Sequence, residues 1–373
     1  MEEVLMSSEE KYNNKKNKIF TPKEIKEIKF DFNDILIEPS KTTDIISRAE
    51  VDVRYGSQFG DFGHLPLIAA PMDTVVSLSN LQEFTNNNIN VCLPRGEKYD
   101  KHGNDGAKMI FTSYSLIEFT ELFFAKKQEK HPSHVLIDIA NGHMSDLIYV
   151  TKKAKEYYGK SMQLMVGNIA NYETYKELSL AGADYIRCGI GNGAGCLTTE
   201  QVGVGYPMGS LIKSCYIASQ SLPENKRAKI VADGGMKKYA DVIKALALGA
   251  DYVMLGSIFN KALESSSKNY WKKIPLSNSL ANFLYKKGFK ITKHFRGMST
   301  KEVQKKWGKE KLKTSEGVVR MREVEYKLNQ WIENFEHYLK SAMSYTNSKK
   351  LEEFTGKAKY NMITEQSYKR FNK

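Results

Sequence analysis

The sequence predicts an α/β fold of the (β/α)₈ TIM-barrel type, on the basis of three observations. Eight short apolar runs alternate with amphipathic stretches, and each run ends in a turn signal. Two helix–strand joints are nearly identical, LAGADYI at 180–186 and ALGADYV at 247–253, which indicates one βα unit used twice. The chain has 373 residues, and barrels of this class run from roughly 200 to over 400. Strand–helix alternation alone leaves an open doubly wound sheet as the alternative.

The eight runs have the composition of parallel strands that are buried on both faces, because they are mostly apolar without polar alternation. The segments at 171–183 and 241–250 carry apolar residues at helical spacing and suit the intervening helices. Gly182 and Gly249 stand where the end of a helix favours a left-handed residue. The predicted strands are 65–70, 89–93, 109–112, 135–140, 164–168, 185–190, 229–233 and 252–256.

We expect one catalytic domain at 29–373, preceded by a polar tail at 1–28. The tail lacks the apolar core of a signal peptide, and no apolar run approaches the ~20 residues of a membrane helix. The net charge is +13, but the lysines are spread over several segments, so we expect solvated surface rather than nucleic-acid binding. The four cysteines form no CxxC or zinc pattern, which predicts free thiols in a reducing, cytoplasmic setting.

A glycine-rich loop that ends in a cysteine follows the sixth predicted strand, with the sequence GNGAGC at 191–196. Its glycines let the backbone approach a ligand closely. Cys196 lies in a polar loop before Thr198 and Thr199, as an accessible nucleophilic thiolate would. Cysteine is more often a small buried side chain, so the residues alone leave both roles open for Cys196. We expect the cysteines in strands or helices to be structural: Cys92, Cys188 and Cys215.

Two further glycine-rich segments close the seventh and eighth strands, ADGGM at 232–236 and MLGS at 254–257. Asp233 can accept hydrogen bonds from ribose hydroxyls, and backbone amides at such glycines can face a phosphate. The loops after these two strands are the frequent phosphate site of (β/α)₈ barrels. The alternative is that they are ordinary turn glycines. The segments after the sixth and eighth strands are also long, which predicts active-site loop insertions there.

Several segments together resemble the IMP dehydrogenase/GMP reductase family. They are FDFNDILIEP (30–39), SRAEVDV (47–53), AAPMDTV (69–75), DIANGH (138–143), GNIA (167–170), GIGNGAGCLTTEQVGVGYP (189–207), ADGG (232–235), MLGS (254–257) and RGMS (296–299). The resemblance implies that Cys196 attacks C2 of a purine nucleotide and holds it as a covalent thioimidate. It also implies that Thr198 passes a proton at the departing or attacking group.

The resemblance implies binding roles for further residues, and a homotetramer. The substrate-binding residues would be Asp233, Gly234, Gly235, Gly256, Ser257, Gly297, Met298, Ser299, Lys313, Ser315 and Gly317. The residues that contact the dinucleotide, NADPH or NAD, would be Ser47, Arg48, Asp138, Ile139, Ala140, Ser341 and Ser344. A potassium ion would be held by the backbone carbonyls of Gly191, Gly193 and Cys196.

The stretch after RGM favours a reductase over a dehydrogenase. IMP dehydrogenase oxidises IMP with NAD and hydrolyses the adduct with the help of an Arg-Tyr pair, whereas STKEVQKKWGKEKLKTSEGVV (299–319) has no such pair. GMP reductase instead expels ammonia from GMP with a Thr–Glu pair and then adds hydride from NADPH to give IMP. Glu316 stands in the S-E-G position of that enzyme. An IMP dehydrogenase with an unusual flap, and a nucleotide-binding protein without turnover, are the alternatives.

The chain departs from the family pattern at a few positions around the site. They are Leu197 for a Thr, Thr199 for an Arg, Phe295 for a Tyr whose hydroxyl commonly meets phosphate, Lys313 for an Arg, and Pro94 for a basic residue. A lysine at 313 provides a point charge rather than a bidentate guanidinium. Arg95, next to Pro94, is the candidate to replace the missing basic residue.

Overall fold

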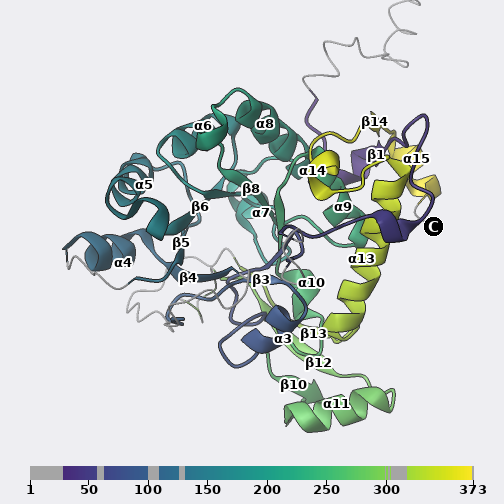
Figure 1. Cartoon of the computed structure of the whole chain (residues 1–373). Coiled ribbons are helices and arrows are strands. Elements are labelled where there is room, and N and C mark those ends of the chain that lie inside the picture. The colour runs from purple at the N-terminus through teal and green to yellow at the C-terminus, as the bar shows by residue number, and fades with distance from the viewer. Residues whose placement is uncertain are drawn as a thin grey trace, which may run out of the picture.

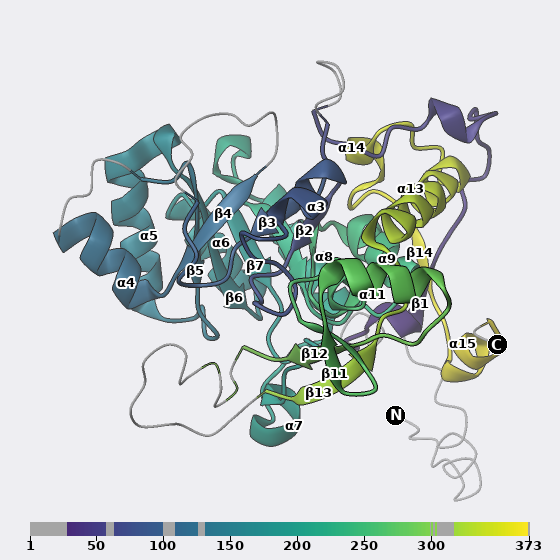
Figure 2. The same ribbon diagram turned by 90° about the horizontal axis from the view of Figure 1, so that it is seen from below.

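The computed structural model describes residues 28–56, 63–99, 109–125, 131–298, 300, 303 and 317–371, and it confirms the barrel. Eight parallel strands follow one another around a closed barrel, and β2 pairs with β9 to complete it (Figures 1 and 2). This closure excludes the open sheet. The strands are β2 (Leu67–Ala69), β3 (Asn90–Cys92), β4 (Ile110–Tyr114), β5 (His134–Asp138), β6 (Gln163–Ile169), β7 (Tyr185–Cys188), β8 (Lys229–Asp233) and β9 (Tyr252–Leu255).

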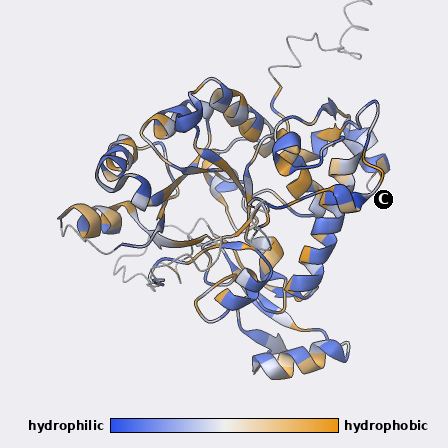
Figure 3. Cartoon of the chain, viewed as in Figure 1, coloured by the Kyte–Doolittle hydropathy of each residue, from blue (hydrophilic) through white to orange (hydrophobic). Residues whose placement is uncertain are grey.

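Each predicted strand overlaps one barrel strand, because the strands are buried on both sides as their apolar composition indicated. One set of strand side chains, which includes Ile68, Phe111 and Met254, packs in a core of its own. The other set, which includes Leu67 and Val253, joins the helices in a second and larger core. Figure 3 shows the corresponding hydrophobic colour on the barrel strands and on parts of the surrounding helices.

The larger helices that follow the strands cover the outside of the barrel (Figure 1). Asn171 caps α6 by accepting a hydrogen bond from the amide of Thr174 at 2.8 Å. Gly182 and Gly249 have φ values of +100° and +121°, as the helix ends predicted. The helices are α3 (Leu81–Asn86), α4 (Leu116–Thr120) with a π turn (Glu121–Ala125), α5 (Ser145–Tyr158), α6 (Tyr172–Leu180), α7 (Thr198–Val202), α8 (Met208–Gln220), α9 (Tyr239–Leu248) and α10 (Ser257–Asn260).

The chain after α10 builds a second, antiparallel sheet beside the barrel, in the order β11-β10-β12-β13. Its members are β10 (Asn269–Trp271), β11 (Ile274–Leu276), β12 (Thr292–Arg296) and β13 (Val319–Glu323), with α11 (Asn278–Lys286) between β11 and β12. The long helix α13 (Leu328–Tyr345) then runs beside the barrel (Figure 1). In the part of the chain that the structure covers, no helix has the length and apolar character needed to cross a bilayer.

The two ends of the described chain meet, because β1 (Ile35–Ile37) pairs antiparallel with β14 (Tyr360–Met362). Apart from Ile28, the predicted tail at 1–28 lies outside the described residues. The remaining short elements are η1 (Phe32–Asp34), η2 (Arg48–Glu50), η5 (Gly159–Ser161), η6 (Glu224–Lys226), α14 (Leu351–Phe354) and α15 (Glu365–Phe371).

Candidate active site

A cavity of about 650 Å³ lies at the carboxyl ends of the barrel strands, where loops from β5, β7, β8 and β9 meet the end of β12. Active sites of (β/α)₈ barrels lie on this face. Residues from distant parts of the sequence therefore share one wall. The predicted site residues that line the cavity are Asp138, Ile139, Ala140, Gly193, Cys196, Asp233, Gly234, Gly235, Gly256, Ser257, Gly297 and Met298.

Cys196 is the cysteine that faces this cavity. It is partly exposed, and its thiol lies 3.2 Å from the hydroxyl of Thr198, the partner that the sequence predicted. Cys92, Cys188 and Cys215 are fully buried, which confirms their predicted structural role. Burial raises the pKa of the Cys92 thiol, so that side chain stays protonated. The accessible thiol of the chain is therefore Cys196.

Internal hydrogen bonds hold the cysteine loop in one shape. Gly191 has φ +85°, and a Cβ there would lie 1.8 Å from the hydroxyl oxygen of Thr199. That hydroxyl donates to the carbonyl of Val204 at 3.1 Å, and the Asn192 amide donates to the carbonyl of Tyr206 at 2.9 Å. Thr199 thus fastens the loop to the GVGYP segment behind it, and only glycine fits at position 191.

The segment from Gly297 to Val318, here called the flap, begins and ends against the cysteine loop. The amide of Val318 donates to the carbonyl of Gly195 at 3.1 Å, and the amide of Gly297 donates to the carbonyl of Val318 at 3.0 Å. Gly317 forms a bridge with Cys196. The contact is so close that a Cβ on Gly297 would lie 2.3 Å from the Gly195 oxygen. Figure 2 shows α7 beside β12 and β13.

Four of the predicted residues in the flap lie outside the described residues: Ser299, Lys313, Ser315 and Glu316. Gly317 follows Glu316 directly in the chain, and its bridge to Cys196 is described. The end of the flap therefore comes to the nucleophile, and the role of Glu316 stays a prediction.

An arginine that the sequence did not single out, Arg187 on β7, joins two of the predicted site carboxylates. Its Nη1 lies 2.6 Å from Oδ1 of Asp138, and its Nη2 lies 2.8 Å from Oδ2 of Asp233. The side chain is buried. Burial alone would lower the pKa of Arg187, but Asp233 and Asp138 raise it by more, so the net shift is upward. The available signal was an arginine inside an otherwise apolar strand run.

Asn168 at the end of β6 completes the support of Asp233. Its amide donates to Oδ2 of Asp233 at 2.7 Å and to the carbonyl of Gly189 at 2.8 Å. Arg187 uses the same oxygen, so both described hydrogen bonds to the carboxylate fall on Oδ2. Oδ1 of Asp233 accepts none within the described part of the chain, which suits it to accept from a ligand hydroxyl.

Arg95 lies in the cavity beside Asp138. Its Nε is 3.3 Å from Oδ2 of that carboxylate, and it also donates to the Asp138 carbonyl. The structure therefore places Arg95, the candidate for the basic residue missing at Pro94, against Asp138, which is one of the predicted cofactor residues.

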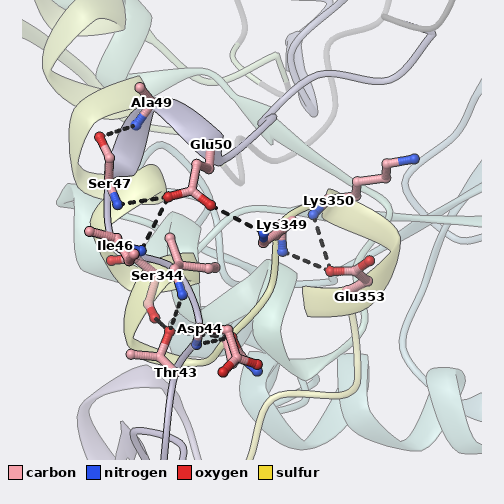
Figure 4. A network of polar contacts seen from close by, with 12 residues as sticks. Thr43, Asp44, Ile46, Ser47, Ala49, Glu50, Ser344, Lys349, Lys350 and Glu353 are labelled. Atoms are coloured by element: carbon pink, nitrogen blue, oxygen red, sulfur yellow. Dashed lines mark hydrogen bonds and ion pairs between the residues drawn. The ribbon is translucent and has the colours of Figure 1, made fainter.

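Ser47 and Ser344, two of the other predicted cofactor residues, lie close together at a second place (Figure 4). Ser47 caps η2 by accepting from the amide of Ala49 at 3.2 Å, and the hydroxyl of Thr43 donates to the carbonyl of Ser344 at 2.9 Å. Ser341, at the same end of α13, accepts from the Ser344 hydroxyl at 2.8 Å. None of Ser47, Arg48, Ser341 and Ser344 lines the cavity. The predicted cofactor residues thus form two groups.

Two of the three backbone carbonyls predicted to hold potassium have no hydrogen-bond donor among the described residues. That of Gly193 accepts from the Cys196 amide at 2.9 Å, whereas those of Gly191 and Cys196 accept no hydrogen bond from the described residues. Carbonyl oxygens are hard ligands of the kind that such cations prefer. No cluster of three or more His, Cys, Asp or Glu side chains suited to a metal ion occurs among the residues described, so a cation here would rely on the backbone.

Comparison with known proteins gives a consistent result. The model of the "IMP dehydrogenase / GMP reductase domain" family matches residues 126–371, more than half of the chain. GMP reductase 2 of Homo sapiens is 28% identical over 356 residues, which cover 91% of this chain and 96% of the relative. GMP reductase of Caenorhabditis elegans is 27% identical over 356 residues, 91% and 94% of the two chains. GMP reductase of Shewanella halifaxensis is 31% identical over 245 residues, 62% and 69%.

Proposed function

The chain belongs to the IMP dehydrogenase/GMP reductase family and is an NAD(P)-dependent oxidoreductase, and from this premise we propose that it reduces GMP to IMP and ammonia with NADPH. The observation that carries the proposal is the cavity in which the one accessible thiol, Cys196, is hydrogen-bonded to Thr198. The relatives that align along most of the chain are named GMP reductase, which supports the reductive direction.

The proposed chemistry begins with the Cys196 thiolate, which adds to C2 of the purine. Thr198, within 3.2 Å of the thiol, and Glu316 then protonate the departing amine, so ammonia leaves and a thioimidate remains. NADPH supplies a hydride to C2 when it is bound. The hydride leaves C2 tetrahedral; the C–S bond then breaks as the C2–N double bond of the purine ring re-forms, which gives IMP and regenerates the thiolate of Cys196.

The cavity wall supports the rest of the assignment. We propose that Asp233, fixed by Arg187 and Asn168, binds the ribose hydroxyls. The phosphate would meet the glycine-rich ends of β8 and β9, and the base would lie against the flap. These two sets are Gly234, Gly235, Gly256 and Ser257 for the phosphate, and Gly297, Met298, Ser299, Lys313, Ser315 and Gly317 for the base and its surroundings.

The cofactor would lie against Asp138, Ile139 and Ala140, with Arg95 as the adjacent cation. We propose a homotetramer, and we assign the second group of cofactor residues, around Ser47 and Ser344, to the cavity of a neighbouring subunit. Support for this comes from the position of that group away from the cavity of its own chain. The carbonyls of Gly191, Gly193 and Cys196 would hold the potassium ion that stabilises the loop.

Intact-protein mass spectrometry tests the covalent step. Incubation with GMP and NADP⁺ allows loss of ammonia but provides no hydride, so the adduct should accumulate and survive an acid quench. We expect a mass increase equal to GMP less ammonia, located on the peptide that contains Cys196. Cys215→Ala, which removes a buried thiol, should retain the adduct, and Cys196→Ala should lose it. An adduct that persists in Cys196→Ala would refute the assignment.

A further inference from the structure

One face of the β12–β13 hairpin gathers positive charge around Phe295. In the antiparallel register, Lys293 is opposite Arg322 and Phe295 is opposite Arg320. Alternate residues of a strand, and their direct cross-strand partners, share one face. Lys293 and Phe295 are each 1% exposed, so the β12 side of this face is packed, whereas on β13 Arg322 is half-buried and Arg320 is exposed. The guanidinium carbons of Arg322 and Arg320 lie 3.9 and 5.5 Å from the centre of the Phe295 ring.

This arrangement is unfavourable for the hairpin alone. Arg320 and Arg322 are both charged and lie over the same Phe295 ring, and like charges held this close on a sheet repel each other. Within the described residues, no carboxylate lies at ion-pair distance from Arg320 or Arg322. Burial first, and then the charge of Arg320, lower the pKa of Arg322 to about 10, and Glu325 opposes this only in part. Among the described residues the cluster thus has no carboxylate partner at ion-pair distance, and a bound anion would supply the opposite charge.

The cluster adjoins the cavity at the end of β9. Phe295 and Ser257 both line the cavity. The guanidinium of Arg322 lies over the Phe295 ring and donates a hydrogen bond to the Ser257 carbonyl at 3.3 Å. Arg320 donates to the carbonyl of Ala194, in the cysteine loop, also at 3.3 Å. Both hydrogen bonds are long, so either arginine can exchange its carbonyl for a better acceptor at small cost.

We propose that Arg322, assisted by Arg320, binds the phosphate monoester of the purine nucleotide. The inference rests on the proposed function for the identity of the nucleotide, but not for the anion site itself. A guanidinium binds a phosphate through two parallel hydrogen bonds. Phe295 lines the cavity, and its ring contacts that guanidinium at 3.9 Å. Recognition of the phosphate would thus come from β13 as well as from the backbone amides at Gly256 and Ser257.

Equilibrium titration of the full-length protein with GMP, with guanosine and with NADPH tests the proposal. Arg322→Met should weaken GMP binding by about 10- to 100-fold, the usual effect of losing a charge-assisted pair. Guanosine and NADPH binding should stay within about twofold of wild type, because neither depends on this contact. Arg322→Lys should give an intermediate loss. Lys290→Met is the control, since its side chain is 81% exposed and it removes the same charge.

Three outcomes would overturn the proposal. Equal loss of GMP and guanosine affinity would mean that Arg322 only shapes the cavity. Loss of NADPH affinity alone would assign it to the dinucleotide. A wild-type protein with no preference for GMP over guanosine would refute the phosphate site. If wild type prefers GMP but does not convert it, the proposed function fails while the phosphate assignment is still tested. Arg322→Met should unfold at no lower temperature than wild type without ligand, because it relieves repulsion.

Discussion

Replacing Arg187 by Met tests how much the buried ion pairs of this side chain contribute to the stability of the protein and to GMP binding. The variant keeps the length of an apolar stem in the barrel, but it removes the hydrogen bonds of 2.6 and 2.8 Å to Asp138 and Asp233. Loss of one partner from a buried ionic network costs about 3–5 kcal/mol, because the remaining charges stay buried without compensation. We expect a loss of this size in the free energy of unfolding, measured by urea denaturation followed by circular dichroism.

Arg54→Met is the matched control for this measurement. Arg54 also makes an ion pair with a carboxylate, Glu336, at 2.8 Å, but its side chain is 36% exposed. Exposed pairs of this kind contribute about 0–1 kcal/mol. Arg187→Met should therefore be destabilised well beyond Arg54→Met, and it should also bind GMP more weakly, since Asp233 would be held by Asn168 alone. Equal stability of the two variants, or full GMP affinity in Arg187→Met, would refute the reasoning.

Three further predictions follow from individual residues. Gly297→Ala should lower kcat/KM for GMP at least tenfold, and it should destabilise the protein by about 1–3 kcal/mol in urea unfolding. The reason is that the new Cβ would lie 2.3 Å from the Gly195 oxygen. Wild-type kinetics in this variant would show that the contact is not tight. Thr198→Val should lower kcat about 100-fold with GMP affinity nearly unchanged; an equal loss of affinity, measured by titration, would assign Thr198 to binding. Burial lowers the pKa of Lys293 to about 7, whereas the unfolded chain holds that proton up to about pH 10. Stability should therefore rise with pH between about 7 and 10, and Lys293→Met should lose this rise when urea unfolding is measured across that range; an unchanged slope would contradict the assignment.

The barrel was predictable because its signal is local. A strand buried on both faces must be apolar along its length, and a helix end must place a residue such as Gly249 in a permissive conformation. Each of these sequence patterns is contained in a short window of the chain. The order of the eight strands then follows from the right-handed alternation of strands and helices.

The supporting network of the site was not predictable in the same way. Arg187 pairs with Asp138 and Asp233 across 49 and 46 residues of sequence, and only the closed barrel turns the three side chains toward one another. The positions of the predicted cofactor residues relative to the cavity could not be predicted from the sequence either. The resemblance named Asp138 and Ser47 together, but the fold of one chain places only Asp138 in the cavity.

The charged face of the β12–β13 hairpin also depends on register. Arg322 is opposite Lys293 and beside Phe295 because the two strands pair with one particular offset. A shift of one residue would move Arg320 and Arg322 to the face opposite Lys293 and Phe295. The sequence shows the basic residues but not the pairing that brings them together.

The most direct test of the proposed function is absorbance at 340 nm with purified protein in the presence of potassium. One cuvette holds GMP and NADPH, and a second holds IMP and NAD. The account predicts a fall in the first cuvette with stoichiometric release of ammonia, no change in the second, and no change in either for Cys196→Ala. A rise in the second cuvette would identify a dehydrogenase, and silence of the wild-type protein in both would contradict the reductase assignment.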